Sequence, residues 1–329
     1  MFTNKDIRCF ILTCDRPVLL QKTLKTLLWQ EGGPWDIYVL DNSTDDKTKN
    51  LLRSKYPQIH YVDNRADRKP MANLRKLRQL TITSYSLTLH DDDLLAPTYL
   101  KNALKLLNNY PGINAVFAKF KIFHGYRFPL TVKFKRRVTK HWLLNNKSDF
   151  ALSFWDKPAC TWTGSILKSD LYKNMPAEDL YKIFGKIHDI PMLIETVGQG
   201  KVCIFTDSYV YTRIHGASDT QNDNTGITLQ NLKNWLNYFK QFAQSNPKLQ
   251  ALYNQYVYYK AYITYKYHVS NEEKPNCPSI EDFLERENLL FAPVSFWCKI
   301  RTKKYFKPFN RIVRSFYNTG YYKQFLRDL

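Results

Sequence analysis

Short apolar runs alternate with amphipathic stretches over about the first hundred residues. The runs predict buried strands at 7–13, 36–40, 59–62 and 85–89. Between them, leucines recur at helical spacing and predict helices that begin at Pro17 and Pro97 or span 48–56 and 71–83. This regular alternation of strand and helix predicts an α/β fold with parallel strands.

The pattern changes after the fourth strand. Further strands are expected at 115–123, 130–134 and 201–213, and a Thr-Trp-Thr-Gly-Ser turn at 161–165 precedes a short helix. Helical spacing then predicts helices at 229–242 and 249–268, followed by a polar linker at 271–278. The chain is therefore expected to be α/β first and helical afterwards.

The composition is that of a folded protein. With 44% hydrophobic residues in a chain of 329, there is enough apolar surface for one large domain or two modest ones, which excludes intrinsic disorder. No apolar run approaches the roughly 18 residues of a transmembrane helix. The six cysteines are scattered without paired spacing, so we expect reduced thiols in a cytoplasmic protein.

The net charge is unusual. Lys and Arg number 49 against 29 Asp and Glu, a formal charge of +20, which predicts an anionic partner. Residues 94–148 hold eleven Lys and Arg and no acidic residue, and 296–329 hold nine with one Asp, interleaved with ten aromatics. The latter segment is expected at an anionic membrane surface. Single-stranded nucleic acid and a solvated helical face are the alternatives.

Polar clusters follow three of the predicted strands: Thr13 to Pro17, Asp41 to Ser43, and Asp91 to Asp93. Ligands of open α/β sheets bind at these strand ends. Three adjacent carboxylates repel one another unless a cation compensates, and Mg²⁺ or Mn²⁺ prefers such oxygen ligands. The alternative is a solvated helix N-terminus, which also favours acidic residues.

These three clusters resemble the motifs of the family 2 glycosyltransferases, of the type that assembles bacterial glycans. Residues 11–17 resemble the turn T-x-N-R-P, residues 39–45 resemble V-x-D-x-S-x-D, and residues 89–97 resemble L-D-x-D-D-x-x-x-P. The resemblance implies a GT-A fold over 1–220, an α/β Rossmann-like mixed sheet with flanking helices. A helical, basic and aromatic C-terminal region would then occupy 221–329.

The resemblance also implies site residues. The nucleotide-sugar contacts would be Thr13, Arg16, Asp41, Asn73, Asp91, Asp92 and Arg213. The ligands of Mn²⁺ or Mg²⁺ would be Asp92, Asp93 and His215. The catalytic base would be Asp189, and the acceptor contacts would be Trp162, Thr163 and Gly164. Two histidines depart from the family pattern: His90 replaces its first Asp, and His188 replaces the Glu before the base.

Several of these residues have a structural alternative. Asp41 could close a turn or cap a helix, and Asn73 could lie on a helix surface. Asp189 could cap a helix, His215 could close the sheet, and Trp162 could belong to the core.

The implied activity is metal-dependent, inverting transfer of one sugar from a nucleotide-sugar, with a UDP-sugar expected. The acceptor would be a glycan or lipid-linked glycan at the cytoplasmic face of the membrane, with the enzyme peripheral there and an oligomer possible. The processive signature Q-x-x-R-W is absent, which favours a single transfer. No Gly-rich loop follows the first strand, which argues against a nucleotidyltransferase. The alternative function is a basic nucleic-acid- or membrane-binding protein with a structural acidic triplet, although no nucleic acid is expected.

Overall fold

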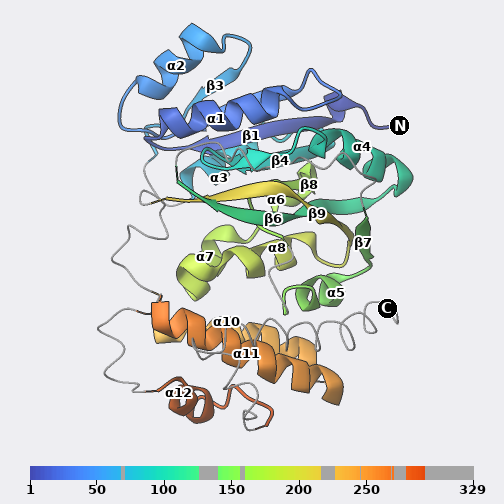
Figure 1. Ribbon diagram of the computed structural model, residues 1–329, viewed down its shortest axis with the longest axis vertical. Helices are drawn as coiled ribbons and strands as arrows, with labels where there is room; N and C mark the ends of the chain where they lie inside the picture. The colour runs from blue at the N-terminus through green and yellow to red at the C-terminus, as the bar shows by residue number, and fades with distance from the viewer. Residues whose placement is uncertain are drawn as a thin grey trace. The chain divides into compact units, whose positions relative to one another are not determined.

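The structure is a computed structural model that describes residues 1–67, 71–125, 140–155, 160–215, 227–244, 246–267, 269 and 279–292. The chain divides into two compact units, Met1–Asp223 and Asn224–Leu329 (Figure 1). All strands of the described sheet lie in the first unit.

The described strands of the first unit form one mixed sheet in the order β3-β2-β1-β4-β8-β6-β9-β5, with β7 also paired to β9. They are β1 Ile7–Thr13, β2 Asp36–Asp41, β3 His60–Asp63, β4 Tyr85–His90, β5 Leu94–Leu95, β6 Ile113–His124, β7 His141–Leu144, β8 Ser165–Lys168 and β9 Lys201–Ile214. Strands β1 to β4 are parallel, β8 is antiparallel to β4 and β6, and β6 is parallel to β9. The expected mixed sheet with flanking helices is confirmed.

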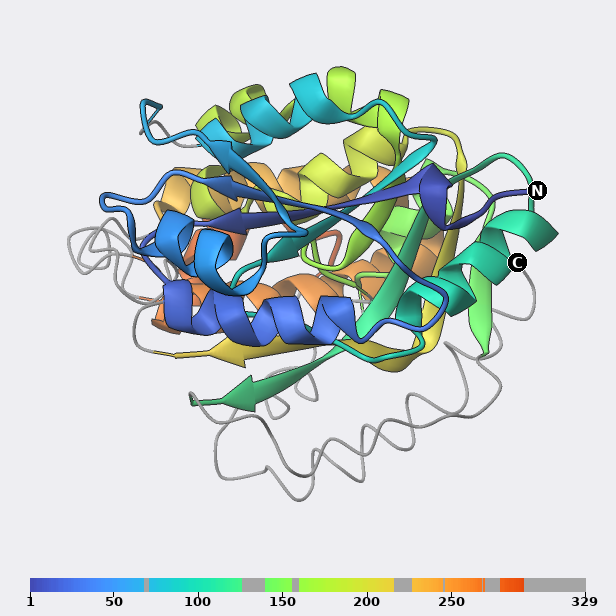
Figure 2. The ribbon, with the colours of Figure 1, turned by 90° about the horizontal axis from the view of Figure 1, so that it is seen from above.

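Helices cover both faces of this sheet. They are α1 Pro17–Leu28, α2 Lys47–Lys55, α3 Ala72–Leu80, α4 Tyr99–Asn109, α5 Lys147–Leu152, α6 Ser169–Lys173, α7 Ala177–Phe184 and α8 Asp189–Val197. Figure 2 shows α1, α2 and α4 on one side of the strands, and α3, α6 and α8 on the other. The 3₁₀ turns Asn4–Asp6 and Gly185–Ile187 precede β1 and α8.

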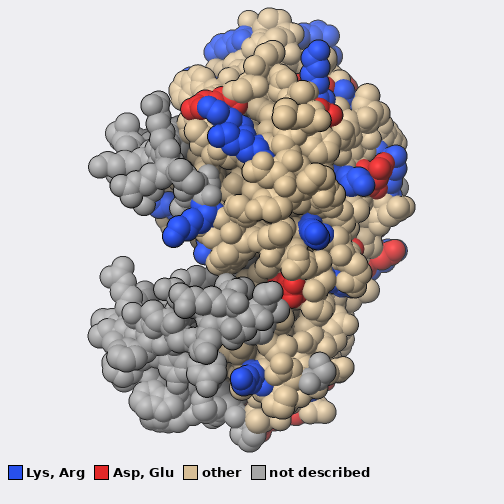
Figure 3. Space-filling model, turned by 90° about the vertical axis from the view of Figure 1, so that its right-hand side faces the viewer, with Lys and Arg blue, Asp and Glu red and all other residues tan. Residues whose placement is uncertain are grey.

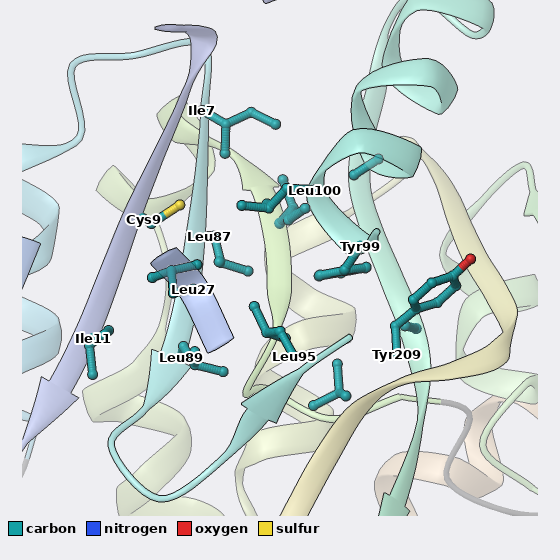
Figure 4. Packing of buried hydrophobic residues seen from close by; sticks show 14 of the residues in the cluster. Ile7, Cys9, Ile11, Leu27, Leu87, Leu89, Leu95, Tyr99, Leu100 and Tyr209 are labelled. Atoms are coloured by element: carbon teal, nitrogen blue, oxygen red, sulfur yellow. The ribbon is translucent and has the colours of Figure 1, made fainter. Parts of the chain in front are cut away.

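The hydrophobic spacing of α1 explains its place against the sheet. Pro17 stands at the first helical position, where a missing N–H costs nothing. Leu20, Leu24 and Leu27 then recur on one face and are fully buried. Figure 4 shows the core they join, where Leu27 lies among residues of β1, β4, β5 and α4.

The four N-terminal strands and the helices between them are confirmed to within a few residues. The expected helix after the acidic triplet begins two residues late, at Tyr99 rather than Pro97. The reason is that Leu94–Leu95 pair with β9, and the Ala96 N–H donates to Tyr209 O (2.8 Å). Strand β8 also lies where only a turn and a helix were expected, and 130–134 lies outside the described residues.

The second unit is helical in its described part, as expected. It contains α10 Leu229–Lys240, the 3₁₀ turn Gln241–Ala243, α11 Pro247–Tyr267 and α12 Ile280–Arg286. Leu236, Phe239, Tyr253 and Val257 are buried between α10 and α11, and the Tyr253 hydroxyl donates to Leu236 O (2.9 Å). Helix α12 was not expected, and the linker at 271–278 lies outside the described residues. Among the helices described, none has the length and apolar character needed to cross a membrane.

Candidate active site

The three polar clusters meet at one edge of the sheet. Strands β1, β2 and β4 are adjacent and parallel, with Thr13 opposite Asp41 and Leu12 opposite His90. The turns that follow them therefore lie side by side, at the strand ends where open α/β sheets bind ligands. The structure thus brings together segments that are separated by up to about 80 residues in the sequence.

Asp91 is fully buried and ties the β4 turn to the β1 turn. Its Oδ2 accepts hydrogen bonds from Thr13 Oγ1 (2.7 Å) and Cys14 N (3.3 Å), and its Oδ1 lies 2.9 Å from an Arg16 guanidinium nitrogen. Burial raises the pKa of Asp91 to about 6, although the charge of Arg16 acts in the opposite direction. Asp91 therefore anchors the turn from within.

Asp92 carries the negative charge most readily. Its Oδ2 lies 2.9 Å from His215 Nε2 and 3.3 Å from Arg16 NH1. Burial opposes ionisation, but the positive charges of His90 and Arg16 and the His215 hydrogen bond together lower the pKa of Asp92. The predicted metal carboxylate is thus held ionised between basic groups.

Asp93 is more deeply buried, and its Oδ1 accepts the Arg213 N–H (2.9 Å). Burial, with the charge of Asp92, raises the pKa of Asp93 to about 7. Carboxyl groups of the unfolded chain ionise near pH 4. Because folding raises the pKa of Asp91 and Asp93, their ionisation lowers the stability of the free protein as the pH rises from about 4 to 7. A bound cation would offset that cost.

A metal-ligand set is present at this turn. One potential ligand atom from each of His90, Asp92 and Asp93 lies within 4.8 Å of the others. Two carboxylates and an imidazole fit Mn²⁺ or Mg²⁺, the first more closely because it accepts nitrogen ligands. His215, the histidine predicted from the sequence, directly follows β9 and contacts the same Asp92. His90 was treated as a departure from the family motif, and the structure places it within the ligand set.

The β2 turn is organised around Asp41, which is fully buried. Its Oδ1 accepts the Ser43 N–H (2.9 Å), and its Oδ2 accepts the Tyr61 hydroxyl (3.1 Å). The turn-closing alternative for Asp41 is therefore present in the structure. Asn73, on α3, donates to Thr13 O (3.2 Å) and so connects the same region to β1. The nucleotide-binding roles of Asp41 and Asn73 stay predictions.

Asp15 is a site residue that sequence reasoning missed. Its φ is +55°, a left-handed conformation that Asp and Asn tolerate better than other non-glycine residues. Its Oδ1 accepts hydrogen bonds from the N–H (2.6 Å) and hydroxyl (2.8 Å) of Thr44, and its own N–H donates to Ser43 Oγ (2.8 Å). The available signal was its match to the Asn of the T-x-N-R-P motif.

Arg213 was predicted to contact the nucleotide, but its described contacts are internal. It is 3% exposed, its Nε donates to Asp92 O (2.9 Å), and its NH1 donates to Gly125 O (2.6 Å). The guanidinium also lies over the Phe123 ring, 4.5 Å from its centroid. Arg213 therefore supports the backbone of the acidic turn, and a nucleotide contact stays a prediction.

The three predicted acceptor residues lie beside the same turn. Thr163 Oγ1 accepts the His90 N–H (3.1 Å), and Trp162 is buried against the Tyr172 ring at a centroid distance of 6.1 Å. Gly164 has a φ of +78°, and its N–H donates to Thr88 O (2.7 Å). Thr163 and Gly164 thus bond to β4 just before β8 begins, and Trp162 packs against α6. The contact of all three with an acceptor stays a prediction.

We expect Gly164→Ala to lower the free energy of unfolding by about 2–4 kcal/mol. A Cβ at this position would lie 2.5 Å from Val210 Cγ2, and an L-residue is strained at this φ. Gly112→Ala is the control. The φ of Gly112 is +86°, but no heavy atom lies within 4 Å of where its Cβ would be, so only the backbone strain of about 1–2 kcal/mol remains. Urea unfolding measures both, and equal losses would contradict the close approach to Val210.

The predicted base, Asp189, begins α8 and has a side chain that is 53% exposed. His188 occupies the N-cap position, so the capping alternative for Asp189 is wrong. His188 is buried, with Nδ1 2.9 Å from Gly185 O and Nε2 3.6 Å from Asp189 Oδ1. The predicted base is thus an accessible carboxylate beside a buried imidazole.

The family assignment follows from a match that covers half of the chain. Residues 9–175 match the model of the family described as "Glycosyl transferase family 2". The chain belongs to this family. The matched region includes the three strand-end clusters and the predicted acceptor residues, so this family 2 glycosyltransferase carries the motifs at the geometry just described.

Solved structures show the same fold. The S. aureus TarS 1-349 structure in complex with UDP-GlcNAc gives a TM-score of 0.54 at 16% identity, over 87% of this chain and 84% of that chain. The corresponding complex with UDP gives 0.54 at 14% identity, over 96% and 93%. At these identities the likeness shows the GT-A fold of the glycosyltransferase. Among curated proteins, no relative matches the chain.

Proposed function

We propose that this glycosyltransferase is metal-dependent and transfers one sugar, with inversion, from a UDP-sugar to a hydroxyl of a glycan or lipid-linked glycan. The observation that carries the proposal is the ligand set of His90, Asp92 and Asp93 at the end of β4, directly beside the β1 and β2 turns. A structural acidic triplet alone would not require an adjacent imidazole and an ionised central carboxylate.

His90, Asp92 and Asp93 would hold the cation, and His215 contacts Asp92 beside them. A bound Mn²⁺ or Mg²⁺ supplies Lewis-acid stabilisation of the departing diphosphate. Arg16 would complement the phosphates, because its side chain is 18% exposed at the same turn and carries a permanent charge. The Arg16 contacts with Asp91 and Asp92 keep that charge at the strand ends.

Asp189 would act as the general base. Its exposed carboxylate accepts the proton of the acceptor hydroxyl as the hydroxyl oxygen forms a bond to the anomeric carbon of the donor sugar. The bond from that carbon to the diphosphate oxygen breaks on the opposite side, and the nucleoside diphosphate leaves. A single displacement of this kind inverts the anomeric centre.

The choice of UDP-sugar rests on the fold neighbours. The S. aureus TarS structures with a TM-score of 0.54 contain UDP-GlcNAc and UDP. UDP is therefore the first nucleotide to test, and UDP-GlcNAc the first donor.

A calorimetric titration tests the metal-dependent donor site. We expect the affinity for UDP to rise by about tenfold or more when Mn²⁺ is present, because the cation would join the carboxylates to the diphosphate. Hydrolysis of a panel of nucleotide-sugars, followed as nucleotide release, then identifies the donor. UDP affinity that is the same with Mn²⁺ and with EDTA would contradict the metal-dependent site.

Salt-sensitive binding of oligonucleotides, without metal-dependent UDP affinity, would instead favour the nucleic-acid alternative.

The basic aromatic segment at 296–329, proposed for an anionic membrane surface, lies outside the described residues. On the face of the molecule in Figure 3, Lys and Arg side chains form separate groups with Asp and Glu among them.

A further inference from the structure

Helix α1 and the turn directly after it carry three buried polar residues that face the acidic turn. Thr23 and Thr26 are three residues apart on α1 and so share one side of the helix, and Gln30 follows two residues after the helix ends at Leu28. Their exposed fractions are 0%, 2% and 5%. We call these three residues the polar stripe. Buried polar groups are costly unless they are hydrogen-bonded, so their partners indicate their role.

Thr23 contacts the backbone of the acidic triplet. Its Oγ1 lies 2.8 Å from both Asp91 O and Asp93 O. The single hydroxyl proton is therefore shared between two carbonyl groups that flank Asp92. A side chain of α1 thus sets the distance between the Asp91 and Asp93 carbonyl groups.

The other two residues continue this contact along the chain. Thr26 Oγ1 accepts the Leu95 N–H (3.2 Å) and donates to Thr23 O (2.9 Å). Gln30 Nε2 donates to Ala96 O (2.8 Å), and its Oε1 accepts the Leu100 N–H (3.1 Å). The polar stripe therefore bonds to the backbone from the triplet into the first turn of α4.

The segment bonded to the polar stripe has little regular secondary structure of its own. Strand β5 consists of Leu94–Leu95 only, and its ladder to β9 joins two residue pairs. The side chain of Leu95 points into the core beside Leu89 (Figure 4), which fixes one side of the strand. The backbone of the strand is held by its short ladder to β9 and by the Leu95 N–H bond to Thr26 of α1.

We infer that the polar stripe positions the acidic turn for cation binding, with Thr23 as its central residue. The same helix starts immediately after Arg16, whose guanidinium contacts the side chains of Asp91 and Asp92. One helix thus contacts both the backbone of the turn, through Thr23, and two of its carboxylates, through Arg16 at its N-cap position. This inference rests on the proposed function for its catalytic meaning.

Two measurements on Thr23→Val test the inference. Valine keeps the shape and removes the hydroxyl, so we expect amide hydrogen exchange in the peptide covering 91–96 to accelerate by roughly tenfold or more. We also expect the Mn²⁺-dependent affinity for UDP to fall by about tenfold, the usual effect of removing a group that orients metal ligands. Thr23→Ser, which retains the hydroxyl, should restore both.

Thr81→Val is the matched control. Thr81 is also buried and donates one hydrogen bond to a backbone carbonyl, Arg78 O (3.0 Å), at the end of α3. Thr81→Val should leave both readouts unchanged. Unchanged exchange in Thr23→Val, unchanged Mn²⁺-dependent affinity, or an equal effect of Thr81→Val would overturn the inference.

The outcomes separate the two proposals. If the wild-type protein shows no Mn²⁺-dependent UDP binding, the proposed function fails, and the exchange comparison alone decides whether the polar stripe holds the turn. If Thr23→Val does not fold, Thr26→Val removes the acceptor of the Leu95 amide and should accelerate exchange at that amide. Normal protection of Leu95 in that variant would then overturn the inference.

Discussion

Asp92→Asn should lower sugar transfer by roughly a thousandfold while leaving the protein folded. The substitution removes the carboxylate charge that both Arg16 and His215 contact, and with it one of two acidic ligands in the proposed metal site. Metal-ion catalysis is worth several kcal/mol, and about 4 kcal/mol corresponds to that factor. Initial rates of transfer or donor hydrolysis, together with UDP titrations in Mn²⁺, measure the effect.

Asp36→Asn is the matched control for a lost ion pair. Asp36 Oδ2 lies 2.8 Å from Arg8 Nε, and the two residues are paired across β1 and β2 at the strand ends opposite the site. This variant should lose stability without losing transfer or Mn²⁺-dependent UDP affinity. Asp92→Asn with wild-type transfer would remove Asp92 from the metal site, whereas inactivity of Asp36→Asn would show that the assay reports folding.

Asp189→Asn should reduce kcat by about 10²–10⁴-fold, the usual contribution of a general base. The amide cannot accept the acceptor proton, but it keeps the size and exposure of the carboxylate. We therefore expect the donor KM and the affinity for UDP to remain close to wild type, in contrast to Asp92→Asn. Steady-state kinetics with varied donor concentration separate kcat from KM.

Asp179→Asn provides a neighbouring control. Asp179 is an exposed carboxylate on α7 that pairs with Lys182 (3.2 Å), and its loss removes one negative charge near Asp189 in the chain. It should leave kcat within about twofold of wild type, because surface ion pairs contribute little. If Asp189→Asn retained full activity, the base would have to be another group.

The parallel half of the fold could be read from the sequence because its strands are continuous apolar runs. Ile7–Thr13 and Tyr85–His90 are buried on both faces, so their composition alone identifies them. Strand β5 could not be found this way. It has only two residues, and it exists because they pair with Val210 and Tyr211, more than a hundred residues later.

The types of residue in the site predicted its chemistry. The burial and charge of each residue depend on packing and were harder to predict. Adjacent aspartates at a strand end predicted a cation site, but no sequence rule says which aspartate is buried and which is held ionised. That division depends on burial and on His90, Arg16 and His215, which lie near Asp92 but come from different elements. The leucine spacing of α1 identifies its buried apolar positions, but it does not identify Thr23 as a contact of the acidic turn. A polar residue between buried leucines was the available signal.

Strand β9 has a consequence for the smallest functional fragment. It lies between β6 and β5, pairs with β7, and ends beside the acidic turn with Arg213 and His215. The family match ends at residue 175, before β9 begins. A fragment cut at that boundary would expose the edge of β6 and leave Asp92 without its imidazole partner. Among the described strands of the sheet, β9 comes last in the chain and completes the proposed site, so we expect no donor binding by a nascent chain until about residue 215 has left the ribosome.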